Sequence, residues 1–72
     1  MKDAKRFDML RAKYRTLWDA HQVIADHNAR LVKSGTYPSN EQLINEQRAA
    51  EAVQFAKQEL LAAMSRARAE TT

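Results

Sequence analysis

In the first half of the chain, mostly apolar residues recur at alternating intervals of three and four. We call the line of contact that such a repeat forms along a helix a seam. The repeat is unbroken through Phe7, Leu10, Tyr14, Leu17, His21, Ile24, Asn28 and Leu31. Side chains three and four residues apart lie on one side of an α-helix, so this heptad pattern predicts a long helix packed along a narrow face. The second half repeats the spacing through Ala49, Val53, Ala56, Leu60, Ala63 and Ala67. It predicts a second long helix whose contact face is rich in alanine.

The residues between these two patterns predict a single tight turn. The only glycine and the only proline of the chain, Gly35 and Pro38, fall in this segment. Gly35 suits the left-handed position after a helix, and Pro38 prevents helix continuation. Ser39 and Gln42 have the spacing of a capping box, which starts the next helix. We therefore predict helices at about residues 4–33 and 40–68 joined by a turn at 34–38, within one domain.

A connection this short makes the two helices antiparallel neighbours, so the predicted fold is an all-α helical hairpin. Placing Leu31 beside Leu43 sets a register in which the numbers of facing residues add to about 74. Large side chains of the first helix then meet alanines of the second, as in the pair Trp18 and Ala56. Such large-to-small matching permits close packing.

The apolar face of each helix is wider than one partner helix covers. Leu43, Ala50, Leu61 and Met64 widen the second seam, and Trp18, Ala25 and Val32 flank the first. A chain of 72 residues without cysteine has neither the core size nor the disulfides that usually stabilise so small a protein. We therefore predict a homodimer in which two hairpins form a four-helix bundle.

His21 and Asn28 are polar residues at seam positions, and we interpret them as a polar layer that sets register and oligomeric state. A ligand site is the alternative, or a symmetric contact between two copies of His21 that would make assembly pH-dependent. His21 and His27 are six residues apart and project about 120° from each other, so they cannot share a metal ion within one helix. We expect Trp18 to lie in the core and the hydroxyl of Tyr14 to reach the bundle edge.

A second, weaker apolar stripe is predicted on the outside of the second helix, formed by Ile44, Phe55 and Ala62. It either packs on a loop or a second copy, or forms an exposed docking site for another protein.

Composition argues against several classes of function. A chain with one glycine cannot form a glycine-rich phosphate loop, and two helices offer little concave surface for catalysis. No apolar run approaches the roughly 20 residues that span a membrane, and no secretory leader is recognisable. We expect no enzymatic activity, cofactor, metal or membrane partner, and the absence of cysteine fits a cytoplasmic protein.

Positive charge is concentrated where the two helix ends meet opposite the turn. The side chains expected at this pole are Lys2, Lys5, Arg6, Arg11, Lys13, Arg66 and Arg68. They are either solvated cations that pair with nearby acids or a surface that contacts phosphates without reading sequence. The plasmid regulator Rop is similar in size and architecture and binds RNA, although no Rop motif matches this sequence and the analogy transfers no site residues.

Two functional hypotheses follow from the sequence. The first is a small non-enzymatic protein-interaction module or regulatory adaptor that acts as a homodimer. The second is a Rop-like helical hairpin that binds RNA or DNA through the basic pole.

Overall fold

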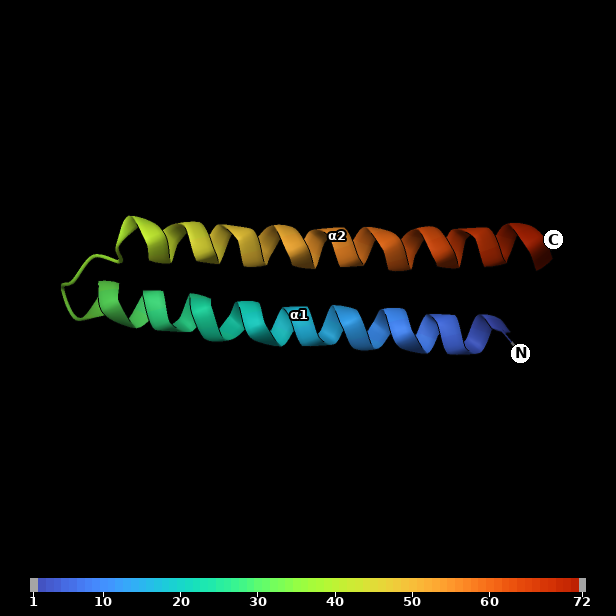
Figure 1. The fold of residues 1–72 in the computed structure, drawn as a ribbon, viewed down its shortest axis with the longest axis horizontal. Coiled ribbons are helices and arrows are strands. Elements are labelled where there is room, and N and C mark those ends of the chain that lie inside the picture. Colours follow the sequence, from blue (N-terminus) through green and yellow to red (C-terminus); the bar gives the residue numbers. More distant parts are fainter. Residues whose placement is uncertain (1, 72) are drawn as a thin grey trace.

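Two long helices make up the fold, as a computed structural model shows (Figure 1). Helix α1 spans Lys2–Lys33 and helix α2 spans Asn40–Thr71. The structure describes the backbone of residues 2–71 and the side chains of residues 4–70. The helices lie antiparallel and side by side, with the turn at one end and both termini at the other. The predicted all-α hairpin is confirmed, and each helix continues two or three residues further towards its chain end than predicted.

The end of α1 is closed by backbone hydrogen bonds to its last carbonyl groups. The N–H of Thr36 donates to the carbonyl of Leu31 at 2.9 Å, and that of Gly35 donates to Val32 at 3.1 Å. This pair of bonds is the Schellman arrangement, which requires a left-handed residue at its centre. Gly35 supplies it with a φ of 85°.

The start of α2 is closed by the predicted capping box. The N–H of Gln42 donates to Oγ of Ser39 at 3.1 Å, and the N–H of Ser39 donates to Oε1 of Gln42 at 2.8 Å. Two backbone donors that lack a helical partner are thereby satisfied. The turn is therefore fixed on both sides, which holds the helices in one register.

Gly35→Ala is expected to destabilise the hairpin through backbone conformation alone. A Cβ added at this position meets nothing within 4 Å, so no steric clash contributes. The left-handed conformation costs a non-glycine residue about 1–2 kcal/mol, which for a domain of this size lowers Tm by roughly 4–16 °C. Thermal unfolding followed by circular dichroism measures this shift. Gly35→Asn is the matched control, because asparagine tolerates the conformation better, and a larger loss for asparagine than for alanine would contradict the explanation.

The predicted seams form the contact between the helices. Every predicted seam position, from Phe7 to Leu31 and from Ala49 to Ala67, is buried or half-buried. The most enclosed apolar side chains among the described residues are Val53, Ala56 and Ala63. All three belong to α2. Its small residues allow the larger side chains of α1 to approach closely, and this close approach encloses them.

The structure adds a polar segment to the end of the α2 seam near the turn. Leu43, which was expected beside Leu31 on the widened face, is 48% exposed. Gln42 and Glu46 are half-buried at the inner positions. These two residues continue the four-three spacing backwards from Ala49, so the seam of α2 begins with a polar segment.

Candidate interaction surfaces

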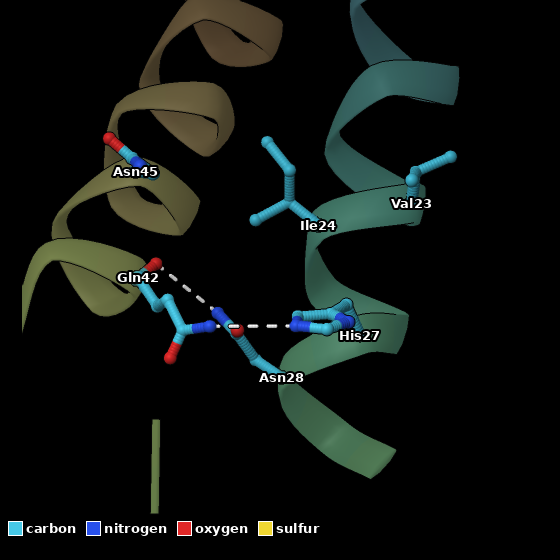
Figure 2. A pocket seen from close by; sticks show the side chains of 6 residues that line it. All are labelled: Val23, Ile24, His27, Asn28, Gln42 and Asn45. Atoms are coloured by element: carbon cyan, nitrogen blue, oxygen red, sulfur yellow. Dashed lines mark hydrogen bonds between the residues drawn. The ribbon is translucent and has the colours of Figure 1, made fainter. Parts of the chain in front are cut away.

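A polar cluster near the turn joins the two helices. The side chain of Asn28 is 4% exposed, and its Nδ2 donates to Oε1 of Glu46 at 2.9 Å and to the carbonyl oxygen of Gln42 at 3.2 Å. The amide Nε2 of Gln42 lies 3.5 Å from Nε2 of His27 (Figure 2). A buried polar group is tolerated only when it is hydrogen-bonded, and Asn28 meets this condition only in the observed register. The placement agrees with the interpretation of Asn28 as a register-setting residue.

Asn28→Ala is expected to lower the free energy of unfolding by about 2 kcal/mol. The change removes a hydrogen bond to a carboxylate, a type worth about 1.5–3 kcal/mol, and leaves Glu46 without this donor. Urea unfolding at matched protein concentration measures the loss. Asn45→Ala is the control, because Asn45 lines the same cleft but is exposed. Equal losses in the two variants would show that the hydrogen bonds of Asn28 contribute little.

The cleft beside this cluster is open, and most of the surface that lines it comes from apolar atoms, although four of its six lining residues are polar. It has a volume of about 500 Å³ and is lined by Val23, Ile24, His27, Asn28, Gln42 and Asn45. Figure 2 shows Ile24 and Asn28 projecting from α1 towards α2, with Val23 pointing away. Within the described residues, no three histidine or acidic side chains gather in a way that could hold a metal ion.

His21 differs from Asn28 in having an incompletely satisfied side chain. It is half-buried, and its Nδ1 is enclosed but has no hydrogen-bond partner within the chain. Its ring lies 6.4 Å from that of Trp18, which in turn stacks at 6.5 Å on Tyr14 with an interplanar angle of 22°. These three residues therefore form a continuous aromatic group near the middle of α1.

Trp18 does not lie in the core of the hairpin, as the sequence had led us to expect, since 45% of its surface is exposed. It lies on one edge of the helix contact, and the ion pair between Lys13 and Glu59, with Nζ and Oε1 3.0 Å apart, marks the opposite edge. At 100° per residue, Lys13 and Trp18 fall about 70° to either side of the centre of the α1 seam. Trp18 therefore faces away from the edge that carries the ion pair.

Three exposed apolar residues of α2 lie on the same side of the hairpin as Trp18. By the same geometry, Leu43, Leu61 and Met64 project to the side of the α2 seam opposite Glu59. Val32 lies on the Trp18 side of α1. We call this surface the open face, and its large side chains, all at least one-third exposed, are Trp18, Val32, Leu43, Leu61 and Met64.

The predicted outer stripe on α2 is also exposed, and it lies away from the helix contact. Phe55 is 66% exposed, and Ile44 and Ala62 are exposed as well. An open groove of about 450 Å³ lies beside Phe55. Its other lining residues are one alanine and four polar residues: Ala50, Gln47, Glu51, Gln54 and Gln58. Phe55 is thus available for contact with another molecule.

The basic pole is present at the ends of the helices opposite the turn. Arg6 and Arg66 line the same groove together with Glu59, so cations of α1 and α2 lie together there beside one carboxylate. Two other cations are paired with acids: Lys13 with Glu59, and Arg11 with Asp8 at 3.8 Å. Lys5 and Arg68 are exposed, whereas the side chain of Lys2 lies outside the described residues.

The structure adds Glu46 to the residues that the sequence had singled out, and it places Gln42, already predicted in the capping box, at an inner position of the helix contact. Their signal was the continuing four-three spacing, which polar side chains at inner positions had obscured. Neither helix, over residues 2–71, is apolar enough along its length to cross a membrane. No family model, curated protein or solved structure is significantly similar to this chain.

Proposed function

We propose that this chain is a small non-enzymatic protein-interaction module that acts as a homodimer. Two hairpins pair through their open faces into a four-helix bundle, and the outward surfaces bind another protein. The observation that carries the proposal is the open face itself, an apolar surface contributed by both helices and left uncovered by the hairpin. Apolar patches of this kind on small proteins mark contact sites. The absence of cysteine fits a cytoplasmic setting for such a module.

The surface area of the isolated hairpin supports the homodimer. A compact monomer of 8.3 kDa exposes about 4,600 Å², whereas this chain exposes 6090 Å². The excess is larger than the roughly 800 Å² that each partner buries in a standard protein interface. The open face extends along a molecule of 55 × 17 × 15 Å, so a second hairpin of the same length can cover it.

Sedimentation equilibrium tests the homodimer. We expect a folded species of twice the chain mass at micromolar concentration, with an average mass that falls towards that of one hairpin on dilution as the dimer dissociates. A folded monomer at the same concentration would overturn the proposal.

The outer stripe is the surface we assign to a second protein. Phe55 lies away from the open face, so it remains exposed when two hairpins pair. Affinity purification from the native host is expected to recover a partner with the unmodified protein and to lose it with Phe55→Asp. Lys5→Glu is the matched control, since it also changes an exposed residue by adding negative charge but should retain the partner.

Nucleic-acid binding through the basic pole is a second proposal, favoured by the groove shared by Arg6 and Arg66. Phosphate contacts of this kind weaken steeply with salt. Fluorescence anisotropy with a labelled RNA hairpin and a labelled DNA duplex distinguishes the two proposals. Salt-sensitive binding that is lost in the combined Lys5→Glu, Arg6→Glu and Arg11→Glu variant, but kept in Phe55→Asp, would favour nucleic acid as the partner.

A further inference from the structure

We infer that the second copy on the open face lies antiparallel, with the turn of each hairpin beside the helix ends of the other. The inference rests on the proposed homodimer and names the arrangement of its interface. Two symmetric arrangements cover the open face. In the first, the two turns lie at opposite ends of the bundle and each helix contacts its own counterpart. In the second, which we call the turn-to-turn pair, the turns lie at the same end and α1 contacts α2 of the other copy.

The charges of the two halves of the hairpin differ in sign. The half near the termini, residues 4–18 and 55–70, carries eight basic and three acidic side chains, a net charge of +5. The half near the turn, residues 19–54, carries three basic and five acidic side chains, a net charge of −2. An antiparallel pair places each positive half beside a negative half, whereas a turn-to-turn pair places like halves together.

The two arginines beside the open face favour the same arrangement. Arg11, Arg15 and Lys57 project to this side, together with Asp8, which pairs with Arg11 at 3.8 Å, and all lie in the half near the termini. In a turn-to-turn pair, Arg15 and Lys57 of opposite copies come to the same level, because facing residue numbers add to about 72, as in the Lys13–Glu59 pair. In the antiparallel pair, Arg11 meets the level of Ala25 and Arg15 that of His21, so neither arginine meets a cation of the other copy, and only the two copies of Lys57 come near each other, at the two-fold axis.

The aromatic group gains a central position in the antiparallel pair. Trp18 lies at the midpoint of α1, which runs Lys2–Lys33. With the centres of the two α1 helices aligned, the Trp18 side chains of the two copies meet beside the two-fold axis. Lys57 lies close to the same axis on α2, and its aliphatic stem can cover apolar surface while the amine extends to solvent.

Distances between spin labels on single introduced cysteines test this arrangement, because the chain has no cysteine of its own. Tyr37→Cys labels the turn, and Ser65→Cys labels an exposed site near the termini. We expect the Tyr37–Tyr37 distance within the dimer to approach the 55 Å length of the hairpin. In a mixture of the two labelled variants, the Tyr37–Ser65 distance between copies should be much shorter.

The outcomes separate the arrangement from the dimer itself. A short Tyr37–Tyr37 distance would overturn the antiparallel arrangement and leave the homodimer intact. No dipolar coupling in either singly labelled variant, together with a monomeric mass in sedimentation, would overturn the homodimer and the arrangement with it. Urea unfolding of each labelled variant verifies that the label has not destabilised the fold.

Discussion

Ala56→Glu is expected to abolish cooperative folding of the hairpin. Ala56 is 2% exposed and belongs to the most enclosed part of the seam. Glutamate there adds volume to a closely packed contact, at about 1–3 kcal/mol, and buries a carboxylate without a partner, at about 3–5 kcal/mol. A 72-residue domain has a free energy of unfolding of about 4–11 kcal/mol, so the loss approaches the whole of it.

Circular dichroism during urea titration measures this effect. We expect low helix content without denaturant and no sigmoidal transition. Ala12→Glu is the matched control, because Ala12 is exposed on α1 and receives the same substitution at the surface. A cooperative transition for Ala56→Glu with a midpoint close to that of Ala12→Glu would show that the seam is not the centre of stability.

Trp18→Glu is expected to dissociate the dimer while each hairpin retains its internal seam. Truncating a central aromatic residue of an interface costs about 2 kcal/mol or more, and a symmetric dimer carries the substitution twice. A total of about 4 kcal/mol raises the dimer Kd roughly 1000-fold. The two added carboxylates also repel each other if the Trp18 positions meet at the two-fold axis.

Sedimentation equilibrium over a wide concentration range measures the change in Kd. Trp18→Phe retains an aromatic ring and should raise Kd far less. Phe55→Glu, on the outer stripe, should leave the dimer unaffected. If Trp18→Glu and Phe55→Glu shift Kd equally, the open face is not the dimer interface.

The helices and the turn were predictable from the sequence because their causes are local. Heptad spacing determines which side of a helix packs, and the Gly35 and Ser39 caps depend on neighbours a few residues away. These features led to the correct helices, their direction and the seam positions from Phe7 to Leu31.

The polar cluster and the position of Trp18 were not predictable in the same way. Leu43 is the more hydrophobic residue beside the turn, yet Gln42 is turned inward, where its side chain belongs to the capping box and its carbonyl accepts from Asn28. The four-three spacing is compatible with this inner position, but the bond to a residue 14 positions away is a tertiary contact that periodicity does not detect. Trp18 satisfies the spacing of a flanking position, but one partner helix leaves 45% of its surface exposed.

The doubly capped turn also limits exchange of helices between copies. Domain swapping of a helical hairpin requires the turn to open. Opening breaks the bonds that Gly35, Thr36 and Ser39 make in the closed turn. A swapped form in which both helices join into one continuous rod would also contain Pro38, whose ring clashes with the carbonyl of Ser34 and which costs about 3 kcal/mol inside a helix. Copies of this chain are therefore expected to associate as intact hairpins, so that dissociation and reassociation leave every helix with its original partner.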